Sequence, residues 1–145
     1  MNRTFTVYRR LPTNAPAELV FSSVEQSLRT TVGGSIERVA NAFHVNNGTN
    51  NLNFAFAGDL SAVITLTQPS PGIVDINGAI ALKPNQLFWI CAIVGAFCLW
   101  FLWGINFQYF IIDPRNNYQV AIDRVQVLPP TSTPHTAGPY DAQLV

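Results

Sequence analysis

The side chains that could bind a metal or transfer a proton are few, and they lie far apart in this sequence. The two histidines are His44, in a segment with strand periodicity, and His135, close to the C-terminal end. A metal site needs several ligands that converge on one ion, and neither histidine has other ligands at a suitable spacing. We therefore predict no metal site, and a structural or solvent-facing role for His44.

The carboxylates are also dispersed along the chain. Asp59 and Asp75 lie at or near predicted turns, where aspartate commonly forms hydrogen bonds with nearby backbone. They are therefore only weak evidence for a catalytic pair of a general acid and a general base. The sequence contains no phosphate-binding glycine motif, no G-x-S-x-G motif and no C-x-x-C motif. These features predict a protein that is not an enzyme.

The charge composition disfavours a nucleic-acid partner. Charged residues make up 11% of the chain, whereas a typical soluble domain has about 25%. Eight basic residues are balanced by eight acidic ones. Because no basic field would attract phosphates, we predict that the chain does not bind nucleic acid.

The longest apolar run in the chain is Leu87 to Ile105, which has no charged, hydroxyl or amide side chain. As a helix it would cover roughly 28 Å, close to the roughly 30 Å of a bilayer's hydrocarbon layer. A buried helix of a globular core is the alternative, but such a helix usually keeps a polar face. The run therefore predicts a single transmembrane helix over residues 84–112.

At 100° per residue this predicted helix has two chemically distinct faces. The residues of the first face are mostly small and favour close packing of a second helix: Cys91, Gly95, Cys98 and Leu102. The residues of the opposite face are aromatic: Trp89, Trp100, Trp103 and Phe107. We expect the aromatic face to contact lipid, or alternatively a pigment or carotenoid, with no cofactor bound covalently.

The residues before this run predict an α+β domain over residues 1–83. Hydrophobic residues recur at helical spacing from Pro16 to Val32, and Gly33 follows as a helix-ending residue. Alternating patterns predict one strand before this helix and a meander of four after it: residues 4–9, 35–45, 52–56, 60–67 and 73–82. The predicted fold is thus one helix packed on an antiparallel sheet.

The residues after the run predict a short helix and a tail. Apolar residues at helical spacing in residues 113–127 predict an amphipathic interfacial helix: Tyr118, Ala121, Ile122 and Val125. Residues 128–145 have too little apolar content to fold alone and predict an extended or disordered tail. Without a secretory signal before the domain, we predict a single-pass membrane protein whose N-terminal domain is cytoplasmic.

These features together favour a non-catalytic accessory subunit of an integral-membrane complex. A photosynthetic reaction-centre or light-harvesting complex is the leading expectation, with a respiratory or transport complex next. The expected partners are integral-membrane protein subunits and the lipid bilayer. The alternative is a membrane-anchored module that binds a small molecule or lipid in a pocket among the apolar residues Val24, Phe43, Phe54 and Phe56.

Overall fold

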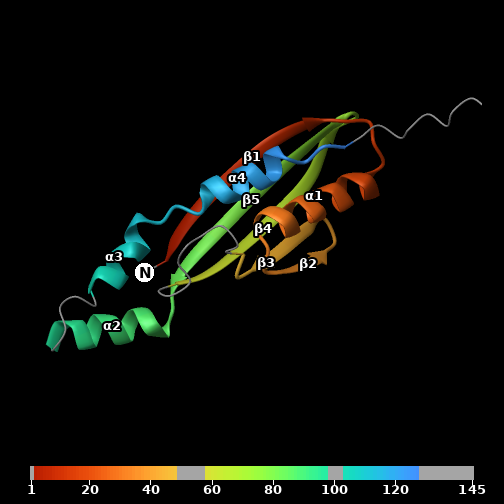
Figure 1. Ribbon diagram of the computed structural model, residues 1–145. Helices are drawn as coiled ribbons and strands as arrows, with labels where there is room; N and C mark the ends of the chain where they lie inside the picture. Colours follow the sequence, from red (N-terminus) through yellow and green to blue (C-terminus); the bar gives the residue numbers. More distant parts are fainter. Residues whose placement is uncertain (1, 49–57, 98–102, 128–145) are drawn as a thin grey trace, which may run out of the picture.

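The computed structural model describes residues 2–48, 58–97 and 103–127, and Figure 1 shows their arrangement. The elements in chain order are β1 (Arg3–Pro12), α1 (Ala17–Thr31), β2 (Ser35–Val39), β3 (Ala42–Asn46), β4 (Gly58–Ser70), β5 (Ile73–Pro84), α2 (Gln86–Phe97), α3 (Trp103–Ile111) and α4 (Arg115–Asp123). The predicted α+β class, with helices and an antiparallel sheet, is confirmed.

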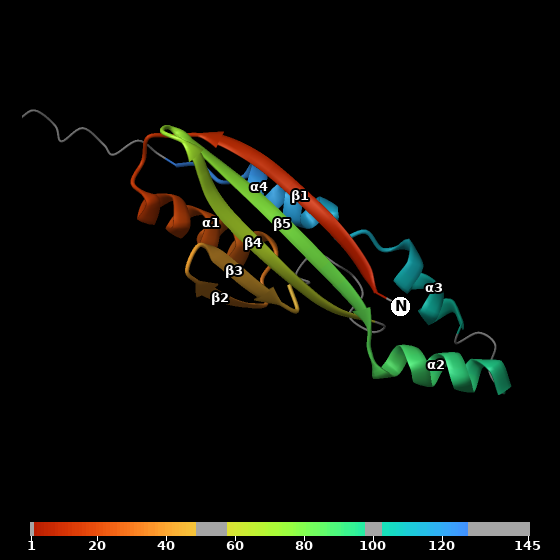
Figure 2. The ribbon, with the colours of Figure 1, turned by 180° about the vertical axis from the view of Figure 1, so that it is seen from behind.

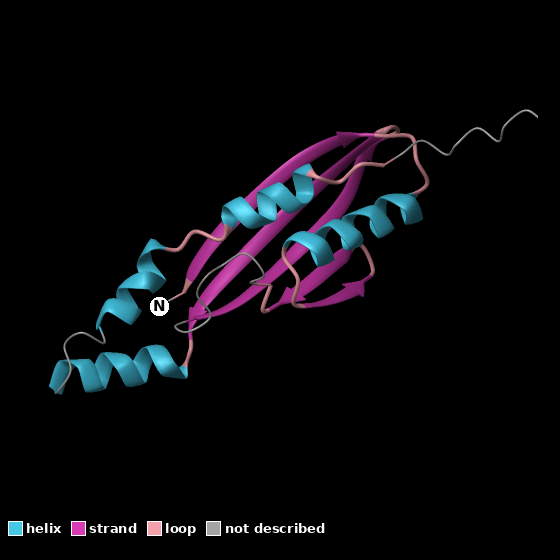
Figure 3. Cartoon of the chain, viewed as in Figure 1, coloured by secondary structure: helices cyan, strands magenta, loops and turns pink. Residues whose placement is uncertain are grey.

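The five strands form one antiparallel sheet in the order β1-β5-β4-β3-β2. Successive side chains of a strand point to opposite faces, so each strand presents one apolar set to the core. Helices α1 and α4 lie side by side over this apolar face (Figure 3). Figure 2 shows the opposite face, over which none of the described elements lies. The domain therefore has two layers.

The single strand predicted for residues 35–45 is two strands in the structure. A tight turn at Ala40 and Asn41 joins β2 to β3, and Ala40 has a φ of 51°. Alanine rarely adopts this left-handed conformation, so Ala40 gives no turn signal and Asn41 alone gives only a weak one. Apolar alternation also continues across the turn. The strand predicted for residues 52–56 lies outside the described residues.

Helix α1 packs its apolar stripe on the sheet as its spacing predicts. Val20, Val24 and Leu28 are buried, and the ring of Phe21 lies 5.9 Å from that of Phe43 on β3. The helix ends at Thr31, and Gly33 follows with a φ of 68°, which suits a residue without a side chain. The core of the domain thus lies between α1 and the sheet.

Helix α4 completes the helical layer. Tyr118, Ala121, Ile122 and Val125 are all buried, and the Ser27 hydroxyl of α1 donates a hydrogen bond to the Ala121 carbonyl (2.5 Å). The interfacial position predicted for residues 113–127 is therefore wrong, because this stripe packs in the protein core. An apolar stripe has the same spacing for either partner. The predicted tail, residues 128–145, lies outside the described residues.

The predicted transmembrane helix is also wrong. Within the described part of the chain, no helix has both the length and the apolar content needed to cross a membrane. The run instead contributes to α2 and α3, with 12 and 9 residues, which rise only about 18 and 14 Å. Residues 98–102 lie outside the described residues.

Three further expectations depended on that span. The single-pass location, the placement of the N-terminal domain relative to a membrane and the role as a subunit of an integral-membrane complex are corrected with it. Composition could not have separated the two structures, because a long apolar run is compatible with one spanning helix or with two short helices that pack together.

Two arginines of β1 bind the C-terminal ends of helices that follow much later in the chain. The Arg3 guanidinium donates to the carbonyls of Tyr109 (2.6 Å) and Ile112 (3.1 Å), at the end of α3. The Arg9 guanidinium donates to the carbonyl of Ile122 and to that of Val125 (3.1 Å), at the end of α4. Because helix ends leave carbonyls without intrahelical partners, each arginine stabilises one helix end.

Candidate functional site

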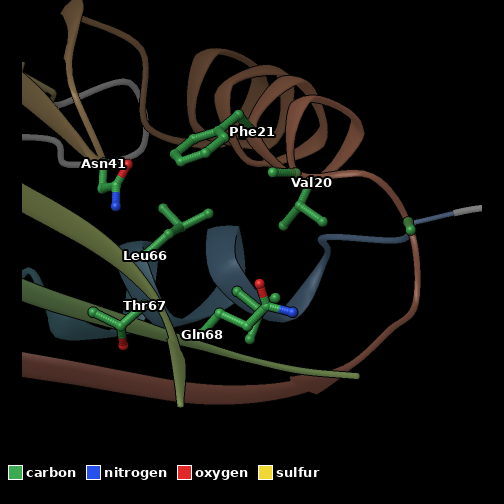
Figure 4. A pocket seen from close by; sticks show the side chains of 9 residues that line it. Val20, Phe21, Asn41, Leu66, Thr67 and Gln68 are labelled. Atoms are coloured by element: carbon green, nitrogen blue, oxygen red, sulfur yellow. The ribbon is translucent and has the colours of Figure 1, made fainter. Parts of the chain in front are cut away.

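A pocket of about 150 Å³ lies between the first turns of α1 and the end of the sheet at which β4 meets β5. Figure 4 shows Val20 and Phe21 from α1 on one side of it and Leu66 from β4 on the other. The pocket is lined by Ala15, Ala17, Val20, Phe21, Asn41, Leu66, Thr67, Gln68 and Val74.

The walls of the pocket are apolar and its mouth is polar. Val20, Phe21 and Leu66 are buried, so the deep part offers hydrocarbon surface. Asn41 and Gln68 are exposed at the mouth and offer amide donors and acceptors. A lining that combines apolar surface with a few polar groups is typical of small-molecule sites.

Local backbone features place these groups. The Leu66 N–H donates to the Asn41 carbonyl (2.9 Å), which holds the turn between β2 and β3 against β4. The pairing of β4 with β5 is irregular between Thr67 and Ser70, next to the pocket. Such irregularities bend a strand and redirect its side chains. The pocket therefore forms where the regular sheet ends.

Arg38 of β2 covers the outer side of Phe21. Its guanidinium carbon lies 3.9 Å from the centre of the Phe21 ring, a cation–π geometry. The same guanidinium binds both carboxylate oxygens of Glu18 on α1 (2.8 and 3.0 Å). The hydrogen bonds from Arg38 lower the pKa of the Glu18 carboxyl below its usual value, against a smaller opposing effect of burial. This pair ties α1 to the edge of the sheet beside the pocket.

The Glu18–Arg38 pair predicts a pH-dependent contribution to stability. Because the folded-state pKa of Glu18 is lowered, the contribution is present above the usual value of 4.5 and is lost as the pH falls through the lowered pKa. We expect Glu18→Gln to lower the urea midpoint slightly at pH 7, since the pair is exposed, and to lower it less at an acidic pH below 4.5. An equal difference at both pH values would contradict this.

The residues predicted to form the two faces of the apolar run are placed as follows. Cys91 and Gly95 of α2 are buried. Trp89, Trp103 and Phe107 are exposed. The other three lie outside the described residues: Cys98, Trp100 and Leu102. The expectation that a partner protein packs on the first face, and that lipid or pigment contacts the second, stays a prediction.

Helices α2 and α3 pack against each other as a hairpin. The ring of Phe88, near the start of α2, lies 5.2 Å from that of Tyr109, near the end of α3. The Asn106 side chain is buried, and in the amide orientation that satisfies both groups its nitrogen donates to the Phe88 carbonyl (3.2 Å) and its oxygen accepts from the Ala92 N–H (3.1 Å). The Tyr109 hydroxyl donates to the Leu82 carbonyl of β5 (3.0 Å). The inner side of the hairpin is thus a packed interface.

The structure does not bring the other chemically capable side chains together. His44 and Asp59 are exposed, and His135 lies outside the described residues. Asp75 binds Arg10 (2.8 and 3.1 Å) and Tyr8 (3.0 Å), contacts that lower the pKa of its carboxyl. Among the described residues no three His, Cys, Asp or Glu side chains lie where they could hold a metal.

Sequence reasoning missed the pocket because its residues come from four separate segments. Ala15 and Ala17 leave space at the start of α1, and Asn41 arrives through a turn that the strand pattern conceals. The two alanines beside Pro16 were the only sequence feature that pointed to this pocket, and they did so weakly. Only the pairing of β3 with β4 places Asn41 beside Leu66.

Comparison with known proteins finds only distant structural likeness. No protein-family model and no curated protein sequence matches the chain. The crystal structure of Ara h 8.0201 matches with a TM-score of 0.39 and 14% identity, over 76% of this chain and 99% of that one. The crystal structure of the di-domain ARO/CYC BexL from the BE-7585A biosynthetic pathway matches with a TM-score of 0.35 and 14% identity, over 87% of this chain and 51% of that one. Neither likeness is close enough to carry an inference about function.

Proposed function

We propose that this chain is a binding module for a small, mainly apolar molecule, which it holds in the pocket between α1 and the sheet. The observation that carries the proposal is the cavity of about 150 Å³ with buried apolar walls and an exposed polar mouth. The pocket opens to solvent beside Asn41 and Gln68, so a small molecule can enter it.

The size and lining of the pocket define the ligand class. A pocket of about 150 Å³ has room for a molecule about as large as benzene. The Asn41 and Gln68 side chains at the mouth favour a ring that carries one hydroxyl or carbonyl group. None of the lining residues is charged, which disfavours a charged ligand.

The pocket is not lined by Val24 or Phe43, two of the residues expected from the sequence. Val24 and Phe43 are fully buried and fill the space between the layers. Phe54 and Phe56 lie outside the described residues. The pocket lies instead toward the start of α1, beside Ala15 and Ala17.

We propose binding without catalysis. The pocket is lined by alkyl, phenyl, hydroxyl and amide groups, and its lining includes no His, Cys, Asp, Glu or Lys. General acid–base catalysis relies on such titratable side chains within hydrogen-bond reach of the substrate. The lining therefore supports recognition of a neutral molecule.

One-ring probes test this proposal directly. We expect fluorobenzene and 4-fluorophenol to broaden and shift in ¹⁹F NMR when the full chain is added. Ala15→Leu fills the pocket and should abolish the effect, whereas Ala79→Leu, on the uncovered face of the sheet, should retain it. Equal binding by the two variants, or none by the unmodified chain, would contradict the proposal.

The polar mouth makes a separate prediction. Asn41→Ala should weaken 4-fluorophenol binding by about three- to tenfold, since one hydrogen bond contributes roughly 0.5–1.5 kcal/mol. Fluorobenzene binding should stay the same, because that probe has no hydroxyl group. The Asn41 backbone contact with Leu66 is retained in this variant, so the turn keeps its position. Equal losses for both probes would mean that Asn41 does not recognise the hydroxyl group.

A further inference from the structure

The α2–α3 hairpin has an apolar outer surface on both of its helices. Nine large hydrophobic side chains of these helices are between 38% and 65% exposed: Leu87, Trp89, Ile90, Ile93, Val94, Trp103, Phe107, Phe110 and Ile111. Contiguous apolar surface of this kind usually marks a contact with protein or membrane.

The polar side chains on the inner side of the hairpin have hydrogen-bond partners. The Asn106 amide is buried against the backbone of α2, and the Tyr109 hydroxyl is bonded to the Leu82 carbonyl. Gln86 and Gln108 are exposed, but they belong to the first turn of α2 and the last turn of α3. These two turns lie at the base of the hairpin, next to the sheet. The described outer surface farther from the sheet is therefore apolar.

The hairpin also projects away from the domain. Figures 1 and 2 both show α2 and α3 beyond the end of the sheet at which β5 ends and β1 begins. No residue from Pro84 to Ile112 is charged. The described charged residues at its base comprise three cations and two anions: Arg3, Lys83, Arg115, Asp59 and Asp113.

We propose that this hairpin inserts into one leaflet of a lipid bilayer. Lipid chains can surround an apolar hairpin, whereas a second copy of the chain would cover one side of it. Protein interfaces usually have a polar rim, and the charge-free sides of the hairpin provide none. The charged residues at the base carry a net positive charge, since Arg115 pairs with Asp113, and Lys83 has the long side chain that reaches anionic headgroups.

The helix lengths set the depth of insertion. Helix α2 rises about 18 Å and α3 about 14 Å, whereas the hydrocarbon layer is about 30 Å thick. The two described helices therefore reach about the middle of the bilayer, and the strand before them and the helix after them stay on the same side. This arrangement differs from the single span that the structure excludes for its described helices.

Tryptophan fluorescence provides the test, because all three tryptophans, Trp89, Trp100 and Trp103, belong to this segment. The full chain is mixed with phosphatidylcholine vesicles that contain or lack phosphatidylglycerol. We expect sedimentation with both kinds of vesicle and tighter binding to the anionic ones. The emission should shift to the blue and be quenched by lipids brominated on their acyl chains.

Matched variants separate the hairpin from the rest of the surface. Ile93 and Phe107 are 60% and 64% exposed, so glutamate at either position leaves the packed inner side intact. Ile93→Glu and Phe107→Glu should each weaken vesicle binding by more than about tenfold, since a carboxylate is costly in hydrocarbon. Val39→Glu, at a similarly exposed position on β2, should bind like the unmodified chain.

Three results would overturn the proposal. The first is a folded chain that neither sediments with vesicles nor shifts its emission. The second is unchanged vesicle binding by the glutamate variants. The third is a concentration-dependent dimer without vesicle binding, abolished by Ile93→Glu, which would identify a second copy as the occupant. The ¹⁹F NMR experiment on the pocket reports independently of all three.

Discussion

Replacing Gly78 by valine is expected to lower the free energy of unfolding by about 3 kcal/mol, because the added atoms have no space in the sheet. Gly78 lies on the core face of β5, opposite Val7 of β1 and Ile64 of β4. A Cβ at this position would lie 2.4 Å from the Val7 Cγ2 and 2.7 Å from the Ile64 Cδ1. Urea unfolding followed by circular dichroism measures the loss.

The next residue supplies a control for this prediction. Ala79 points to the uncovered face of the sheet and is exposed, so Ala79→Val should change stability by less than about 0.5 kcal/mol. Val7→Ala removes one of the clashing methyl groups. We therefore expect Gly78→Val to cost about 1 kcal/mol less in the Val7→Ala background. Equal costs in the two backgrounds would mean that the close contact with Val7 is not the cause.

Replacing Arg9 by methionine is expected to lower the free energy of unfolding by about 1.5–3 kcal/mol, the usual contribution of hydrogen bonds to a charged group. The guanidinium of this half-buried residue binds the carbonyls of Ile122 and Val125, where α4 ends. Methionine retains the apolar stem and removes only the donors. The loss should appear as a lower urea midpoint and as faster hydrogen exchange in α4.

Arg10 is the matched control, one residue along β1 and on the opposite face. It pairs with Asp75 at 2.8 Å, but its side chain is 59% exposed. Exposed ion pairs contribute little, so Arg10→Met should lower the urea midpoint much less than Arg9→Met does. Similar losses for the two variants would show that the helix-end contact of Arg9 is not what stabilises α4.

The sequence predicts the fold class because local periodicity reports which side chains face a core. The stripe of α1, with Val20, Val24 and Leu28, is buried as its spacing predicts. The apolar alternation of β4 and β5 likewise matches the core face of the sheet. Periodicity shows which face of an element is buried but not what packs against that face. The apolar stripe of α4 was therefore predicted, whereas its partner was predicted to be a membrane interface and is the protein core.

The arrangement of the apolar run around a helix likewise predicts which side chains are buried but not what they pack against. Within each helix it separates the buried from the exposed side chains: Cys91 from Trp89 in α2, and Asn106 from Phe107 in α3. Whether one helix or two carry these faces depends on contacts between residues far apart, such as the Phe88 ring with that of Tyr109. No local pattern encodes those contacts.

The pocket is still less accessible to sequence reasoning. Its walls join the start of α1 to β4 and β5, and Asn41 reaches it only because Ala40 adopts a left-handed conformation. That conformation is rare for alanine and gives no sequence signal. The site therefore depends on the assembled sheet.

The position of β1 governs the order in which this chain can fold. Its residues pair with β5, from Arg3 opposite Leu82 to Pro12 opposite Ile73. The Arg9 guanidinium binds carbonyls at the end of α4, which is synthesised later still. Because β1 is synthesised before β5, it gains its partner strand late, and such non-local pairing slows folding. Until β5 has been synthesised, β1 is an unpaired strand that is open to pairing with another chain.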